Sequence, residues 1–200
     1  MIPVARVPEP SGFDERARRP GKAWLAEHPG TERPRDFWSP FRELLAEGFA
    51  HRCGYTAMLD LAGTIDHFRS CKTHPELTYE WTNLRYASQW INSAKKSVEV
   101  LDPYEVGEGW FEILLPSMQL VATERIPPDR RELALATLKR LPIAHDERVL
   151  KQRRHWYRLY EAKKLSLEGL RSVAPLIAAA EEKRLAAVRA AEGPASKPAT

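Results

Sequence analysis

Four polar residues between positions 66 and 97 constrain this chain more than any other feature of its sequence. Asp66 and His67 stand side by side, and Asn83 and Asn92 follow, nine residues apart. A carboxylate, an imidazole and a carboxamide in this order can hold one divalent cation on a phosphodiester and activate a water to attack it. The stretch therefore predicts the chemistry of a one-metal nuclease.

The residue types indicate a role for each member. Asp66 and Asn92 offer hard oxygen ligands, which suit Mg²⁺ or Mn²⁺. His67 suits a general base, although on a strand it points away from Asp66 unless the strand bends. Nine helical residues span about 13 Å, so Asn83 and Asn92 cannot both bind one ion on a regular helix. We therefore assign Asn92 to the metal and Asn83 to bracing the loop that aims His67.

The motif resembles the HNH (ββα-metal) endonuclease family, most closely its members in which asparagine replaces the last histidine. The resemblance implies an α+β fold: a ββα-metal core, a second short hairpin and a mainly helical C-terminal part. In that core, a hairpin would run from residues 51–56 to 64–68, and a helix from Asn83 to Asn92. The residues that carry the resemblance are Asp66-His67, Trp81-Thr82-Asn83-Leu84, the spacing from Asn83 to Asn92, and Lys95-Lys96-Ser97.

Ordinary structural roles compete with these assignments. His67 could be a buried histidine bonded to the backbone, and Asn83 could be a helix N-cap. Lys95 and Lys96 could form a solvated helix end or contact phosphate. Arg69 could hold a phosphate oxygen or form a surface salt bridge.

The sequence departs from the family at the cysteines. Many HNH proteins hold a zinc with two Cys-x-x-Cys pairs, but Cys53 is followed by Thr56 at the second position of the first pair. Ser88 and Ile91 occupy the places of the second pair. We therefore expect no structural zinc, and a hydrophobic group to hold the motif together instead.

Length and composition set the outer limits. The 200 residues suit one compact domain, or a small core with a helical extension, and 43% hydrophobic content can fill a core. A net charge of +4 permits nucleic-acid binding without demanding it. The sequence shows no membrane-spanning run and no secretory signal, and its two cysteines suit a reducing cytoplasm. We expect a cytoplasmic protein.

The chain divides into four predicted parts. Residues 1–37 are rich in Pro and Arg and indicate a flexible arm. Residues 38–125 would hold the nuclease core and a flanking hairpin, with strands at 110–115 and 118–123. Residues 126–192 show helical periodicity and would form a helical extension, interrupted at Pro175, and residues 193–200 a disordered tail. Seven Lys or Arg between residues 144 and 164, against three acids, indicate a solvated face or a DNA-backbone patch.

This layout is also similar to the nuclease subunits of Septu-type anti-phage defence systems, which work beside an ATPase subunit. The resemblance implies a DNA endonuclease in bacterial defence with an ATPase partner. Two alternatives stay open: a subunit with an HNH fold that binds DNA or a partner without cutting, and an RNase toxin.

Overall fold

The computed structural model describes residues 1–192, which form an α+β fold of seven α-helices and two antiparallel hairpins. Short 3-10 or π-helical turns join several of these elements. The strands are β1 (Thr64–His67), β2 (Leu84–Ala87), β3 (Phe111–Leu114) and β4 (Gln119–Ala122). The helices are α1 (Arg19–Glu27), α2 (Arg42–Gly48), α3 (Gln89–Lys95), α4 (Pro128–Arg140), α5 (Glu147–Glu161), α6 (Leu167–Val173) and α7 (Pro175–Glu192).

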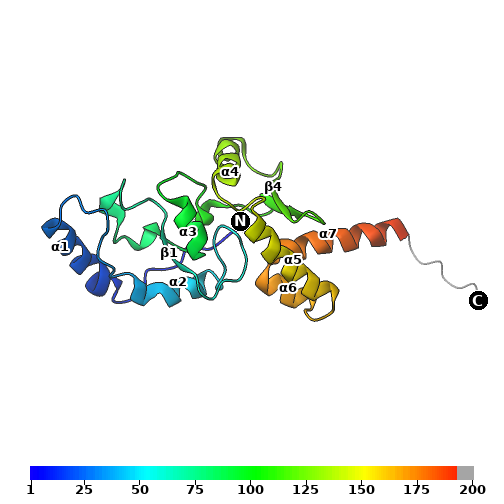
Figure 1. The fold of residues 1–200 in the computed structure, drawn as a ribbon, viewed down its shortest axis with the longest axis horizontal. Helices are drawn as coiled ribbons and strands as arrows, with labels where there is room; N and C mark the ends of the chain where they lie inside the picture. The colour runs from blue at the N-terminus through cyan, green and yellow to red at the C-terminus, as the bar shows by residue number, and fades with distance from the viewer. Residues whose placement is uncertain (193–200) are drawn as a thin grey trace, which may run out of the picture.

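The molecule is elongated: the N-terminus lies near its middle, α1 lies at one end and α7 at the other (Figure 1). Helices α1 and α2 lie with β1 and α3 in one half, and α5, α6 and α7 in the other (Figure 1). The residues of β1 and α3 that were predicted to act in catalysis or metal binding therefore lie in the N-terminal half. Among residues 1–192, no helix combines the length and apolar character that crossing a membrane requires.

The first hairpin differs from the predicted one. Strand β1 pairs with β2, not with residues 51–56, which contribute one isolated bridge between Arg52 and Leu59. The helix that was expected to begin at Asn83 begins at Gln89, so residues 84–87 are a strand. The helix prediction for residues 84–87 was wrong because both faces of β2 are buried. A strand that is buried on both faces lacks the alternating apolar and polar pattern by which a half-exposed strand is recognised.

The N-terminal segment, predicted as a flexible arm, packs against the rest of the protein. Phe13 is fully buried and its ring packs on those of Phe41 and Trp81, at centroid distances of 5.0 and 5.1 Å. The Trp81 indole Nε1 donates to the Val7 carbonyl oxygen at 2.9 Å. These few apolar anchors outweigh a Pro- and Arg-rich composition because they bury large aromatic surfaces.

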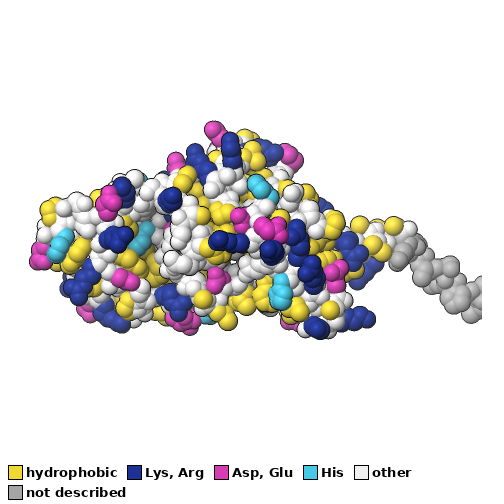
Figure 2. All heavy atoms as spheres, viewed as in Figure 1, with side chains coloured by type: hydrophobic (Ala, Val, Ile, Leu, Met, Phe, Trp, Pro, Cys, Tyr) yellow, Lys and Arg dark blue, Asp and Glu magenta, His cyan; other side chains and the backbone are white. Residues whose placement is uncertain are grey.

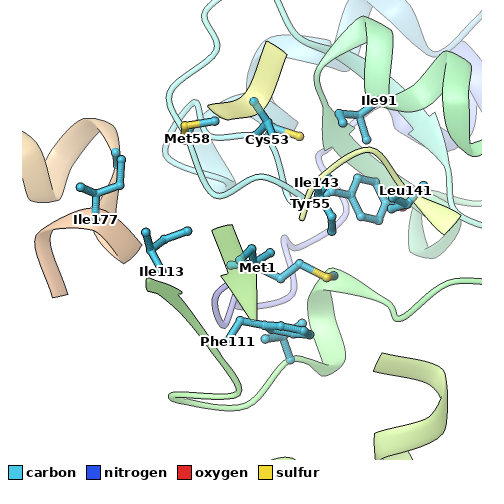
Figure 3. Close-up of a cluster of buried hydrophobic side chains, with 14 of the residues drawn as sticks. Met1, Cys53, Tyr55, Met58, Ile91, Phe111, Ile113, Leu141, Ile143 and Ile177 are labelled. Carbon is cyan, nitrogen blue, oxygen red and sulfur yellow. The ribbon is translucent and has the colours of Figure 1, made fainter. Parts of the chain in front are cut away.

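The second hairpin and the C-terminal helices follow the prediction. Strands β3 and β4 pair antiparallel, and α6 and α7 are separate helices that divide at Pro175. They share one hydrophobic core with the N-terminal half, however, so residues 126–192 are not an independent extension. Figure 3 shows Cys53, Ile91, Ile113 and Ile177 of this core, which come from distant parts of the chain. The predicted tail 193–200 lies outside the described residues.

Candidate active site

The fold of hairpin β1–β2 and helix α3 brings Asn92 of α3 close to Asp66 and His67 of β1. In the antiparallel register, Asp66 lies opposite Arg85 and His67 opposite Leu84. Helix α3 follows β2 after one residue, so it must fold back against the hairpin. The Asn92 side-chain Nδ2 donates to the Ile65 carbonyl oxygen at 3.1 Å, which ties the helix to β1 next to Asp66.

His67 ends β1 with its imidazole held in one orientation. Its Nε2 lies 2.8 Å from the Thr78 carbonyl oxygen, and the ring packs edge-on against Trp38 at a centroid distance of 4.5 Å. A carbonyl can only accept a hydrogen bond, so Nε2 carries the hydrogen and Nδ1 of the neutral ring keeps its lone pair. Burial lowers the pKa of His67 from its usual 6.5. At neutral pH the ring is therefore an uncharged base.

Asn83 fixes the loop that carries Thr78. Its Oδ1 accepts from the Arg69 backbone N–H at 2.8 Å, and its Nδ2 donates to the Arg69 and Leu77 carbonyl oxygens at 3.0 and 3.1 Å. The side chain thus joins the start of the loop between β1 and β2 to its end. It is not a helix N-cap, because α3 begins six residues later at Gln89.

Asp66 is enclosed, and both of its carboxylate oxygens have partners. The residue is 1% exposed. Oδ2 accepts from the Tyr55 hydroxyl at 2.6 Å, and Oδ1 accepts from the Lys95 ammonium at 3.0 Å. Burial, then the nearby carboxylate, raises the pKa of Tyr55 well above 10, so the phenol stays protonated as a donor.

Lys95 is not the phosphate-binding lysine that the sequence suggested. It is 1% exposed, and its Nζ donates to Asp66 Oδ1 and, at 2.8 Å, to the His67 carbonyl oxygen. Its position on the inner side of α3, one turn after Asn92, explains why it is buried. Lys96, the next residue, is exposed and remains open to an anion.

Arg69 has the surface salt bridge that was one of its two predicted roles. Its Nη1 lies 3.1 Å from Glu99 Oε1, and the side chain is 41% exposed. An exposed pair of this kind is weak and can exchange for another anion.

The strand does not bend between Asp66 and His67. Pairing with β2 is regular from Thr64 to His67, so the two side chains leave opposite sides of the backbone. The Asp66 carboxylate faces Tyr55 and Lys95, whereas the His67 ring faces Trp38. The two residues are linked through Lys95, whose ammonium donates both to Asp66 Oδ1 and to the His67 carbonyl oxygen.

The donor set fits a hard cation. Asp66 Oδ1 and the His67 carbonyl oxygen already converge on one positive charge, that of Lys95. Asn92 is anchored through Nδ2, which leaves its Oδ1 as a further oxygen beside β1. Within residues 1–192, no three His, Cys, Asp or Glu side chains gather as a metal-binding group. A site made of one carboxylate, one carboxamide and a backbone carbonyl would not require such a group.

The sequence did not identify the partners on which this geometry depends. The Thr78 contact uses a backbone oxygen, which no side-chain pattern can signal. Arg85 forms a second buried ion pair with Asp102, through contacts of 2.6 and 2.5 Å. Correct pairing of β1 with β2 would have placed Arg85 beside Asp66, because the two are opposite in register.

The basic helix α5 is mostly a surface feature. Arg153 is buried and donates to the carbonyl oxygens of Met118 and Ile143 at 2.9 and 2.8 Å, and burial lowers its pKa to about 10. It is therefore structural. The other basic residues of the segment lie on or near the surface, and Figure 2 shows Lys and Arg side chains, with acidic ones among them, over this region. The Arg148 guanidinium lies 6.0 Å from the Trp90 ring on α3.

No protein-family model and no curated protein matches this chain.

Proposed function

We propose that this chain is a metal-dependent endonuclease of the HNH (ββα-metal) type that hydrolyses phosphodiester bonds in DNA. The observation that carries the proposal is the orientation of His67. A hydrogen bond from Nε2 to the Thr78 carbonyl oxygen at 2.8 Å leaves Nδ1 as a base, on a strand that is followed by β2 and α3.

In the proposed reaction, Nδ1 of His67 removes a proton from a water as the water oxygen attacks phosphorus. The bond from phosphorus to the 3′ oxygen breaks, which leaves a 5′-phosphate and, once that oxygen is protonated, a 3′-hydroxyl. The Thr78 carbonyl stabilises the resulting imidazolium, because it already accepts from Nε2. Asn83 acts indirectly, by holding the loop that carries this carbonyl.

Asp66 and Asn92 would hold one Mg²⁺ or Mn²⁺, with the His67 carbonyl oxygen beside them. When bound, the cation supplies charge stabilisation for the phosphate and the leaving oxygen. The exposed cations Lys96, Arg148 and Lys151 are candidates for holding the DNA backbone near α3. Such contacts carry no sequence information, so we expect cutting that is sensitive to salt and indifferent to sequence.

The proposed setting, bacterial anti-phage defence beside an ATPase subunit, is supported by the resemblance of the motif and layout alone. The same hydrolysis would work on RNA, so RNA is tested in parallel as the substrate of an RNase toxin.

The test compares two histidine variants. Purified protein is incubated with supercoiled plasmid, or with RNA, in Mg²⁺, in Mn²⁺ and in EDTA. We expect nicking of plasmid that EDTA abolishes and that His67→Ala lowers by about 10²–10⁴-fold. His74→Ala is the matched control, because His74 lies in the loop that follows His67 and its side chain is 43% exposed and bonded to Glu76. Equal cleavage by the wild type and His67→Ala would overturn the assignment.

A second candidate function, DNA or partner binding without cleavage, is favoured by one observation. Asp66 is 1% exposed and both of its oxygens are already hydrogen-bonded, as in a purely structural ion pair. Plasmid binding in a gel-shift assay, with no cleavage in either metal, would support this second function over the first.

A further inference from the structure

The Lys95 ammonium occupies a cation position built from the oxygens of β1. It contacts Asp66 Oδ1 at 3.0 Å and the His67 carbonyl oxygen at 2.8 Å, and lies 5.9 Å from the centre of the Phe68 ring. All three of these groups attract a positive charge. A lysine that is 1% exposed at the end of a helix is unusual, because such side chains normally extend into solvent.

These are the oxygens that a divalent cation at Asp66 would need. A second cation beside the ammonium would be repelled by it, and Asp66 Oδ2 is already held by the Tyr55 hydroxyl. We infer that Lys95 is an internal counter-ion, which holds Asp66 in place in the metal-free protein and must leave before a divalent cation can bind. This inference rests on the proposed function, because it concerns the cation proposed for Asp66.

The end of α3 is built so that Lys95 can leave without unfolding the site. Lys95 is the last residue of the helix, and Lys96 has φ +50° and ψ −123°, a conformation that is strained for a residue with a side chain. The last helical hydrogen bond, from Lys96 N to Asn92 O, is long at 3.4 Å. Opening this turn frees Lys95, whereas the Asn92 bond to Ile65 keeps the helix on β1.

The experiment removes the charge of Lys95 and uses Mn²⁺ as the probe. Lys95→Met retains the length of the stem, and Lys95→Gln also retains a hydrogen-bond donor. Free Mn²⁺ is titrated by electron paramagnetic resonance, and thermal unfolding is followed in EDTA and in excess Mn²⁺. The double variant Asp66→Asn/Lys95→Met is the control, because it removes both charges.

We expect the wild type to bind Mn²⁺ weakly and to unfold at nearly the same temperature in EDTA and in Mn²⁺. Lys95→Met should unfold about 10 °C lower in EDTA, because Asp66 is left unpaired. Mn²⁺ should restore that loss, and both single variants should bind Mn²⁺ at least about tenfold more tightly than the wild type. The double variant should be folded and should not respond to Mn²⁺.

Single variants that bind Mn²⁺ no better than the wild type would overturn the inference. The inference would also be overturned if Lys95→Met stayed unfolded in Mn²⁺ while the double variant folded. The cation would then have failed to replace the lysine. These outcomes are separate from the nuclease proposal. Tighter Mn²⁺ binding without any cleavage by the wild type supports the inference and contradicts the nuclease. His67-dependent cleavage by the wild type, with no change in Mn²⁺ affinity in the Lys95 variants, supports the nuclease proposal and contradicts the inference on Lys95.

Discussion

The two hairpins of this protein have the same strand pairing, but only one of them buries charged side chains. Each pairs two four-residue strands in antiparallel register. Hairpin β3–β4 buries apolar side chains, among them Phe111, Ile113 and Leu120. Hairpin β1–β2 also buries apolar side chains, such as Leu84 and Tyr86, but it buries in addition two charged residues opposite each other, Asp66 and Arg85.

The difference shows that the first hairpin depends on partners outside it. Each buried charge needs an opposite charge from elsewhere: Lys95 of α3 for Asp66, and Asp102 for Arg85. A buried ion pair is often no more stabilising than apolar side chains of the same volume, such as those of β3–β4. Under the proposed function, the charge of Asp66 would have a chemical use, because Asp66 adjoins the proposed base.

The largest effect expected from this comparison comes from Arg85→Met. The substitution leaves Asp102, whose side chain is 6% exposed, without its partner. Removing one member of a buried pair typically costs about 3–5 kcal/mol, which urea unfolding would measure as a lower free energy of unfolding.

The matched control is on the other hairpin. Glu112 of β3 pairs with Lys183 of α7 at 3.0 Å, but the side chains are 38% and 76% exposed. Glu112→Gln should cost about 0.2–1 kcal/mol at most. Equal losses in the two variants would show that the buried pair is no more important to the fold than a surface one.

Tyr55→Phe should have an intermediate effect. It removes the hydroxyl that donates to Asp66 Oδ2 at 2.6 Å and leaves a buried acceptor without that partner, at a cost of about 1–3 kcal/mol. Tyr157→Phe is the control in the helical half, because Glu181 Oε2 would keep its contact of 2.8 Å with Arg184 Nε. A loss for Tyr55→Phe no larger than that of the control, by urea unfolding, would contradict the buried network.

The contrast between the hairpins also explains what the sequence could predict. Hairpin β3–β4 is local, with strands separated by four residues, and α6 and α7 divide at Pro175. Local signals of this kind are sufficient for such elements. The partner of β1 lies beyond a loop of sixteen residues, and local patterns could not choose between it and the nearer segment 51–56.

The candidate site was predictable in its residue types and less so in its contacts. The motif predicted His67 and Asp66 as site residues, and it assigned Asn83 to bracing the loop that Asn83 contacts. Burial of Lys95 could not be predicted, because a lysine in the last turn of a helix ordinarily extends into solvent, where its charge interacts favourably with the helix dipole. Its burial depends on Asp66, which lies 29 residues earlier in the chain and reaches it only through the tertiary fold.

The smallest expected effect concerns pH. Because the pKa of folded His67 is lowered by burial, the unfolded chain binds a proton there at a higher pH than the folded chain does. Stability from this group is therefore present above about pH 6.5 and is lost as pH falls from there toward the folded pKa. The slope is limited to about 1.4 kcal/mol per pH unit for one proton.

Urea unfolding of the wild type and of His67→Gln between about pH 5 and 7.5 measures this contribution, since 6.5 is the usual pKa of histidine. Gln keeps a donor for the Thr78 carbonyl and does not titrate, so the other titrating groups cancel in the difference between the two proteins. The wild type should lose more stability than His67→Gln as the pH falls. Parallel pH profiles would mean that His67 titrates alike in the folded and unfolded chains. The ring would then not be the buried, neutral base that the proposed function assigns to the first hairpin.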